Sequence, residues 1–291
     1  MIHIARLCVI GVGLIGGSLA LALRRAGMVN EIVGCGRGEA NLRRAVELGV
    51  VDCYQTDPAL AVAGADAVVL GVPLGNVRAV LMTIRYALDA GAILTDVGSA
   101  KHCVIEDVEA VFDRIPAMFV PGHPVAGTEK SGVEAASADL FQNRRTILTP
   151  LAQTDPQAVR TVTALWESAG AEVISMDAEH HDRMLAATSH LPHLLAFGLV
   201  DTLARWDGGE DLLQYAAGGF RDFTRIASSD PIMWRDICLG NREALLDALQ
   251  HYREDLGVLT ELVRQLDAKG LERVFRNAKD VRDRYLSLLE R

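Results

Sequence analysis

The sequence predicts an α/β fold in two parts: a parallel sheet covered by helices over residues 1–175, then an all-helical domain over residues 176–291. Three observations predict it. The 291 residues are about twice the length of a usual domain. In the first part, short apolar runs alternate with helical patterns, as in repeated strand–helix–strand units. After about residue 176 the strand patterns stop and only helical patterns follow.

The apolar runs of the first part have the length of buried strands. The expected strands are Leu7–Gly11, Glu31–Gly36, Ala67–Val72, Ala92–Asp96 and Met118–Val120. The expected helices are Leu14–Ala26, a segment through Arg43–Leu48, Asn76–Leu88 and Lys101–Arg114. Gly27 ends the first helix and Pro73 stops the third strand, because glycine and proline interrupt regular structure.

Two more strands and a helix complete this part. The strands Thr146–Thr149 and Ala171–Ile174 are expected to extend the same sheet, with the helix Pro156–Ser168 between them. Asp155 is expected to cap this helix, because an aspartate side chain accepts hydrogen bonds from the free amides of a first turn.

The helical part carries a heptad pattern. Its apolar positions alternate at spacings of four and three residues: Leu245, Leu249, Tyr252, Leu256, Leu259, Val263 and Leu266. Such a seam either packs inside the helical domain or meets a second copy of the chain, and the pattern leaves both open. A homodimer through the helical domain follows from the second interpretation.

Composition argues against several kinds of protein. The net charge of -9 makes a nucleic-acid partner or an anionic membrane partner unexpected. The cysteines are scattered without a CxxC pair, which argues against a disulfide framework and predicts a cytoplasmic protein. The uncharged run Leu7–Leu23 is short for a membrane span and rich in glycine, so a buried strand, a turn and a helix explain it better.

Gly11, Gly13 and Gly16 fit the pattern G-x-G-x-x-G between the first strand and the first helix. In this pattern the first glycine allows a tight turn, the second lets the backbone approach a pyrophosphate, and the third lets the helix pack on the strand. The helix start at Leu14 and Ile15 offers free amides to phosphates. The pattern predicts a Rossmann-type dinucleotide-binding domain, with a purely structural turn as the alternative.

The end of the second strand bears on the choice of cofactor. A carboxylate that binds the ribose 2'-hydroxyl is expected there, but the position holds Gly36, followed by Arg37. Without a carboxylate a 2'-phosphate is not repelled, and the Arg37 guanidinium could bind it. This favours NADP over NAD, while an ordinary surface role for Arg37 leaves NAD open.

Three loops follow the carboxyl ends of expected strands, the edge at which α/β sheets bind ligands. Val72 and Pro73 lie in the first loop and are expected to contact the cofactor; Ser99 lies in the second and His123 in the third. Pro124 favours an extended backbone at His123, and a histidine at this edge is a candidate general base. A hydrogen-bonded structural histidine is the alternative.

Four histidines in one stretch, His180, His181, His190 and His193, raise the question of a metal site. Pro192 is expected to interrupt the helix between the last two, so the ligands would not share one face and no metal is predicted. His181 is expected to pack on a helix face.

The motifs GVGLIGGS, DVGSAK, GHPVAGTEKSGVEAA, SHLPH and GGFRDFTRIASSDPIMWRDI together resemble the prephenate/arogenate (cyclohexadienyl) dehydrogenase family of tyrosine biosynthesis. The last two motifs, unlike the glycine motif, are quite specific to this family. The resemblance implies NAD(P)-dependent oxidation of a cyclohexadiene that bears a 4-hydroxyl and a ring carboxylate, with loss of carbon dioxide and aromatisation.

The resemblance also implies roles for residues within these motifs. It makes His123 the residue that contacts the 4-hydroxyl and Ser99 its hydrogen-bonding neighbour close to the nicotinamide. It makes Arg225 the anchor of the ring carboxylate, which a guanidinium fork matches in shape. The residues that it implies line or support the same pocket are Ser189, His193, Thr128 and Asp222.

Two other functions remain as alternatives. A β-hydroxyacid or imine dehydrogenase has a similar build, but it would be expected to use a catalytic lysine in the helical domain, where Lys269 lies far from any motif. A dinucleotide-sensing module would bind nicotinamide without chemistry. Gly36 departs from the aspartate of many NAD-using members, and nothing in the sequence decides between prephenate and arogenate.

Overall fold

The computed structural model describes residues 3–128, 130–206 and 214–289. The chain divides into two compact units, Met1–Ala244 (unit 1) and Leu245–Arg291 (unit 2). The last described strand, β9 (Glu172–Ser175), ends where the domain boundary was expected, and the compact unit continues beyond it. The boundary at residue 175 therefore stays a prediction.

Six parallel strands form the main sheet of unit 1 in the order β3-β2-β1-β4-β5-β6. They are β1 (Ile4–Ile10), β2 (Val29–Cys35), β3 (Cys53–Gln55), β4 (Ala67–Leu70), β5 (Ile93–Asp96) and β6 (Phe119–Val120). The strand order changes direction between β1 and β4, the point at which doubly wound sheets bind ligands at their carboxyl edge. The predicted parallel α/β sheet is confirmed.

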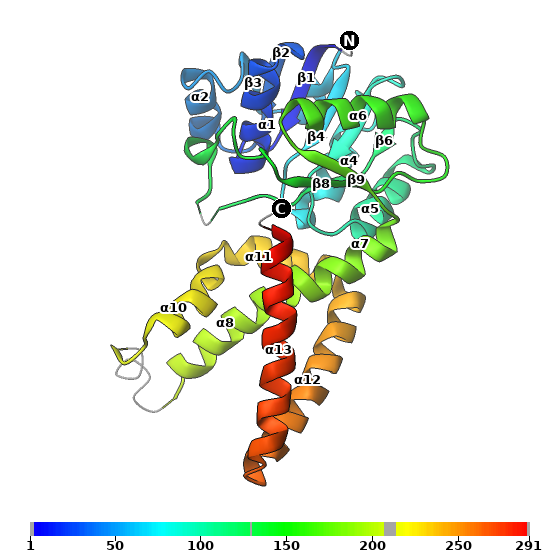
Figure 1. Ribbon diagram of the computed structural model, residues 1–291. Helices are drawn as coiled ribbons and strands as arrows, with labels where there is room; N and C mark the ends of the chain where they lie inside the picture. Colours follow the sequence, from blue (N-terminus) through cyan, green and yellow to red (C-terminus); the bar gives the residue numbers. More distant parts are fainter. Residues whose placement is uncertain (1–2, 129, 207–213, 290–291) are drawn as a thin grey trace. The chain divides into compact units, whose positions relative to one another are not determined.

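Helices cover both faces of this sheet (Figure 1). One face packs against α1 (Leu14–Arg25), α2 (Glu39–Glu47) and α6 (Pro156–Ser168), and the other against α3 (Pro58–Val62), α4 (Val77–Ile84) and α5 (His102–Phe112). Along β1, Leu7 and Val9 belong to one apolar cluster and Cys8 and Ile10 to the other, as strand alternation requires. Asp155 caps α6, as predicted.

The strands that were expected to extend the main sheet form a second sheet instead. β7 (Gly122–Pro124), β8 (Arg145–Leu148) and β9 pair in the order β7-β8-β9, the first pair antiparallel and the second parallel. Pro121 and Pro124 have no amide hydrogen to donate, which limits β6 and β7 and turns the chain out of the main sheet. β3, α3 and β7 were not predicted, because such short elements show no clear period.

Helices make up the rest of the described part of unit 1: α7 (Ala178–Leu185), α8 (Leu191–Ala204), α10 (Gly218–Thr224) and α11 (Pro231–Gly240). A π turn, Ala186–His190, joins α7 to α8 without a break in the helical path. The prediction that Pro192 interrupts this helix is wrong, because the wider turn before Pro192 accommodates a residue that cannot donate a hydrogen bond.

Unit 2 consists of most of α12 (Arg242–Arg264), which begins in unit 1, and of α13 (Ala268–Leu289). The predicted seam runs along α12 except for Leu266, which lies in the following turn with a φ of 54°. Much of the seam is uncovered in the single chain: Leu256 is 48% and Val263 is 59% exposed.

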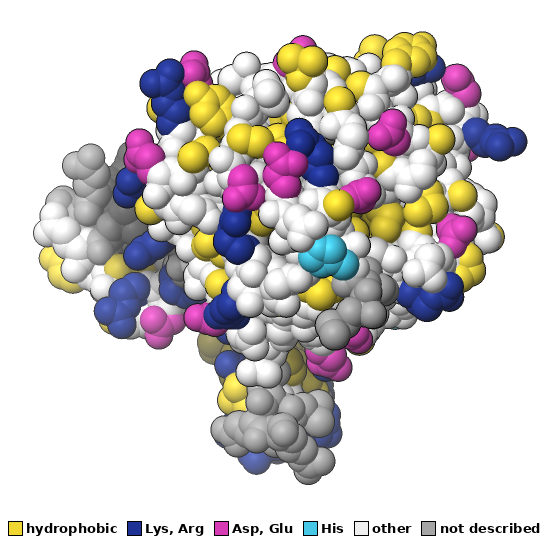
Figure 2. Space-filling view, turned by 90° about the horizontal axis from the view of Figure 1, so that it is seen from above, with side chains coloured by type: hydrophobic (Ala, Val, Ile, Leu, Met, Phe, Trp, Pro, Cys, Tyr) yellow, Lys and Arg dark blue, Asp and Glu magenta, His cyan; other side chains and the backbone are white. Residues whose placement is uncertain are grey.

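Charged side chains of both signs lie interspersed on the face shown in Figure 2, without a continuous basic stripe. Within the described ranges, no helix combines the length and the apolar character that crossing a bilayer requires.

Candidate active site

The glycine motif forms the turn between β1 and α1. Gly11 has a φ of 100°, a conformation that other residues rarely adopt, and a Cβ there would lie 2.2 Å from the carbonyl oxygen of Gly71. A Cβ at Gly16 would lie 2.4 Å from the carbonyl oxygen of Gly11, so α1 approaches β1 as closely as glycine permits. The turn depends on glycine at both positions.

Gly13 differs from them, since a Cβ there would meet no heavy atom within 4 Å. This open space lies at the start of α1, where no side chain caps the amides of Leu14 and Ile15. The loop after β4, with Val72 and Pro73, borders the same turn. Free amides at a helix start, next to a backbone that no side chain covers, can bind the pyrophosphate of a dinucleotide.

No acidic residue follows β2 directly. Gly36 occupies the first position after the strand, and the next residue, Arg37, is exposed. Arg37 adjoins Gly38, the residue before α2, whose first turn has no side-chain cap. A guanidinium and free helix amides thus lie where a Rossmann-type fold binds the ribose of its ligand, and these donors suit a 2'-phosphate as well as a hydroxyl.

A buried ion pair lies between the end of β5 and the loop that follows it, and both of its side chains also hydrogen-bond to the start of β7. The Lys101 Nζ donates to the Asp96 carboxylate and, at 2.6 Å, to the carbonyl oxygen of Gly122. The Gly122 amide donates back to Asp96 at 3.1 Å. The Lys101 and Asp96 side chains are 0% and 1% exposed. The pair therefore clamps the loop that carries Ser99 to the strand that carries His123.

His123 lies on β7 and is 7% exposed. Its Nδ1 lies 2.8 Å from Nε2 of His181 on α7, and Nδ1 of His181 lies 2.7 Å from Oδ1 of Asp182. Burial chiefly, with a smaller electrostatic contribution from the neighbouring His181, Lys101 and His190 side chains, holds the pKa of His123 well below its ordinary value. His123 is therefore neutral at neutral pH and able to accept a proton.

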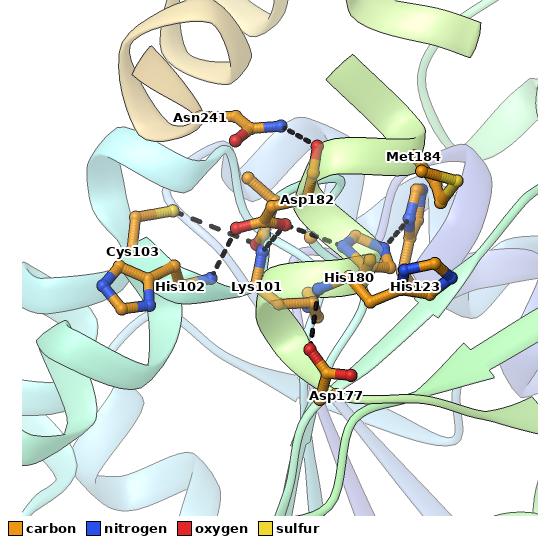
Figure 3. A network of polar contacts seen from close by, with 12 residues as sticks. Lys101, His102, Cys103, His123, Asp177, His180, Asp182, Met184 and Asn241 are labelled. Atoms are coloured by element: carbon orange, nitrogen blue, oxygen red, sulfur yellow. Dashed lines mark hydrogen bonds and ion pairs between the residues drawn. The ribbon is translucent and has the colours of Figure 1, made fainter. Parts of the chain in front are cut away.

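Asp182 anchors this network, as Figure 3 shows. Its carboxylate accepts hydrogen bonds from the backbone amides of Lys101 at 2.8 Å and His102 at 2.9 Å, and Asn241 donates to its carbonyl oxygen at 2.7 Å. Burial alone would raise the pKa of Asp182, but the hydrogen bonds from His181 and the two amides outweigh burial and lower it. Asp182 is a buried, ionised carboxylate.

His190 lies next to this network. Its Nδ1 lies 3.1 Å from the side-chain nitrogen of Asn241, and burial lowers its pKa to about 4 although the backbone of Ser99, close by, favours the charged form. Among the described residues, no side-chain hydrogen bond joins Ser99 to His123, whose Nδ1 partner is His181. The role expected of Ser99 stays a prediction.

The structure brings together three of the residues expected to bind substrate. The His193 ring stacks on Trp234 with ring centroids 3.6 Å apart, and its Nδ1 lies 2.8 Å from the carbonyl oxygen of Ser189. Arg225 is exposed and lies in the 3-10 turn Arg225–Ser228. The pKa of His193 is lowered chiefly by burial and in addition by the positive charge of Arg225, which lies near it. Arg225, His193 and Ser189 thus form one group.

The other two expected substrate residues lie on the surface. Asp222 is exposed and forms an ion pair with Arg221 at 3.7 Å. Thr128 is exposed and accepts a hydrogen bond from the Lys130 amide at 3.3 Å. In the described part of the chain, neither makes a hydrogen bond to His123.

Sequence reasoning missed the groups that hold the imidazole of His123. It did not single out Asp182 or Asn241, and it assigned His181 only to packing. It also left Asp96 and Lys101 without a role, although the motif DVGSAK contains both. No three His, Cys, Asp or Glu side chains in the described residues are arranged to hold a metal ion.

Two family models match the chain, one in each part. The model described as prephenate dehydrogenase, nucleotide-binding domain, matches residues 19–175. The model described as prephenate dehydrogenase, dimerization domain, matches residues 177–277.

Prephenate dehydrogenase of Bacillus subtilis is 38% identical over 277 residues, which is 94% of this chain and 74% of that protein. Cyclohexadienyl dehydrogenase of Zymomonas mobilis is 38% identical over 283 residues, 96% of this chain and 94% of that protein.

A solved structure agrees with these matches. The crystal structure of prephenate dehydrogenase from Aquifex aeolicus, in complex with hydroxyphenyl propionate and NAD+, has a TM-score of 0.87 and 38% identity and covers 98% of each chain. The similarity extends over the sheet and the helices together and does not favour a β-hydroxyacid dehydrogenase. The chain therefore belongs to the prephenate dehydrogenase family and is a dehydrogenase.

Proposed function

We propose that the protein catalyses the NAD(P)-dependent oxidative decarboxylation of prephenate, arogenate or both in tyrosine biosynthesis. A nicotinamide cofactor held at the glycine turn would supply the acceptor for the hydride that leaves the ring carbon bearing the 4-hydroxyl. The hydroxyl proton goes to His123, and the ring carboxylate leaves as carbon dioxide while its bonding electrons complete the aromatic ring as a phenolate. The protonated His123 then returns the proton to the phenolate oxygen. The product is 4-hydroxyphenylpyruvate from prephenate and tyrosine from arogenate. The neutral imidazole of His123, held on a strand tied to the end of β5, carries the proposal.

His123 suits the role of base. As the hydride leaves, the carbon gains carbonyl character and the proton on its oxygen becomes acidic, so an imidazole within hydrogen-bond reach can take it. The depressed pKa keeps His123 unprotonated before the reaction. We assign Ser99, in the loop clamped by the same ion pair, as its hydrogen-bonding neighbour beside the nicotinamide.

Arg225 and its neighbours suit the acidic end of the substrate. A guanidinium fork matches a carboxylate, and binding there holds the diene in place for hydride transfer. His193 is fixed by its stacking on Trp234 and by Ser189 and can present its other ring nitrogen to the substrate. Thr128 and Asp222, which are exposed, are assigned to the rim of the same pocket.

Both nicotinamide cofactors have support. Arg37 and the uncapped start of α2 supply donors for a 2'-phosphate, which supports NADP. The Aquifex aeolicus relative was solved with NAD+, which supports NAD.

A spectrophotometric assay tests the proposal. Prephenate and arogenate are each combined with NAD+ and NADP+, and the absorbance of the reduced nicotinamide is followed. Turnover is expected for at least one of these combinations. Binding of the cofactor without any absorbance change would indicate a dinucleotide-sensing module, and turnover of a β-hydroxyacid alone would indicate the other dehydrogenase class.

Replacing Arg225 by alanine is expected to raise KM for the cyclohexadiene about ten- to a hundredfold with a smaller effect on kcat, because a charge-assisted bond to the carboxylate is lost. Arg225→Lys keeps the charge without the fork and should give an intermediate KM. Arg205→Ala removes an exposed arginine of the same region and serves as the control. An unchanged KM in Arg225→Ala would show that this arginine is structural.

We further propose that the protein is a homodimer through its helical domain. The uncovered seam of α12 supports it, because apolar side chains at heptad spacing are buried by a second helix. Leu256→Glu is expected to shift the protein from dimer to monomer in sedimentation velocity, since a charge would enter the seam. Val258→Glu, at an exposed position of α12 outside the seam, is the matched control. An unchanged dimer in Leu256→Glu would place the interface elsewhere.

A further inference from the structure

We propose that His181, oriented by Asp182, is a positioning residue that sets the tautomer of His123, so that Nε2 of His123 carries the lone pair that takes the substrate proton. The inference rests on the proposed function for its part in the reaction. The tautomer itself can be measured without any activity.

The proposal starts from three side chains in sequence, Asp182, His181 and His123. Oδ1 of Asp182 lies 2.7 Å from Nδ1 of His181, and Nε2 of His181 lies 2.8 Å from Nδ1 of His123. His181 is 0% exposed, and both of its ring nitrogens are used within this line of contacts. Figure 3 labels Asp182 and His123 and marks the contacts between them with dashed lines.

The direction of each hydrogen bond follows from the carboxylate. An ionised carboxylate can only accept, so Nδ1 of His181 carries a proton and donates it to Asp182. A neutral imidazole has one N–H, so Nε2 of His181 is an acceptor and Nδ1 of His123 must donate to it. Nε2 of His123 is then left without a proton.

This is the tautomer that the reaction needs. A free histidine side chain prefers its proton on Nε2, and His123 in that form would offer the substrate hydroxyl a donor instead of an acceptor. General-base catalysis fails when the imidazole holds its proton on the wrong nitrogen. By accepting a hydrogen bond from Nδ1 of His123, His181 stabilises the tautomer that a free histidine side chain disfavours.

The surroundings keep Asp182 from turning. Its two carboxylate oxygens are held by the backbone amides of Lys101 and His102 at the start of α5, and Asn241 holds its carbonyl oxygen. Rotation of the carboxylate would break the bonds to both amides. The orientation of His181, and through it that of His123, is therefore built into the packing of α7 on α5.

Nitrogen-15 NMR of the full-length protein, labelled in its histidine rings, tests the tautomer directly. Protonated and unprotonated ring nitrogens resonate far apart, and the His123 signals are those that disappear in His123→Asn. We expect Nδ1 protonated and Nε2 unprotonated in the wild type at neutral pH, and a shift toward Nε2–H in His181→Leu. A wild-type His123 with its proton on Nε2 would overturn the proposal.

Kinetics separate positioning from a purely structural role. His181→Leu is expected to lower kcat about a hundredfold with little change in KM, because His123 then holds its proton on Nε2 and cannot act as the base, while the substrate contacts remain. His181→Gln places an amide oxygen near the lost Nε2 and should recover part of that kcat. His3→Gln makes the same change at an exposed histidine before β1, at the opposite edge of the sheet, and is the matched control.

Each outcome decides the proposal. Equal kcat values in His181→Leu and His181→Gln, or a loss of kcat without a change of tautomer, would contradict it. If His181→Leu does not fold by circular dichroism, the wild-type spectrum and His181→Gln still decide. If the wild type turns over no cyclohexadiene, the proposed function fails, whereas the NMR result still shows whether His181 sets the tautomer.

Discussion

Replacing His123 by asparagine is expected to lower kcat about a hundredfold or more and to leave KM for the cyclohexadiene close to that of the wild type. Asparagine can still donate a hydrogen bond toward His181, but its amide cannot take a proton. The loss therefore falls on the step in which the hydroxyl proton leaves, and substrate binding through Arg225 persists. Initial rates at saturating cofactor measure both constants.

The control for this variant is cofactor affinity. Because the glycine turn and the start of α1 bind the pyrophosphate in our proposal, His123→Asn should bind the dinucleotide as the wild type does in a fluorescence titration. His3→Asn, an exposed histidine with the same change, should keep full turnover. Turnover of His123→Asn near the wild-type rate would remove His123 from the role of base.

Features with a local spacing could be predicted from the sequence. Gly11, Gly13 and Gly16 lie within one turn, so their pattern alone predicts the strand, the turn and the helix that the structure shows. The alternation of strands and helices likewise predicts a parallel sheet. The second sheet could not be predicted in this way, because pairing between β7 and β8 depends on where the chain turns after Pro121.

The network around His123 depends on contacts between distant parts of the chain. His123 and His181 are 58 residues apart, and Lys101 and Asp182 are 81 residues apart. No period or spacing relates such positions; the packing of α7 against α5 brings Lys101 and Asp182 together, and His123 reaches His181 from β7. A motif search therefore finds His123 as a candidate but not the side chains that orient it.

The ion pair between Lys101 and Asp96 links the stability of unit 1 to the position of this histidine. Both side chains are buried, and Lys101 also holds the carbonyl oxygen of Gly122, the residue before His123. Removing one partner of a buried pair leaves an uncompensated charge, which costs far more than losing a pair on the surface. Lys101 therefore supports both the fold and the site.

Lys101→Met is expected to lower the free energy of unfolding by about 3–5 kcal/mol, seen as a lower urea midpoint, because methionine fills the space but leaves the Asp96 charge unpaired. Adding Asp96→Asn to Lys101→Met should raise the midpoint again, since the double variant buries no charge there. Lys279→Met removes an exposed ion pair with Asp283 and should leave the midpoint almost unchanged. If Lys101→Met unfolds at the wild-type midpoint, or if the double variant is no more stable than the single one, the pair does not hold this edge of the sheet together.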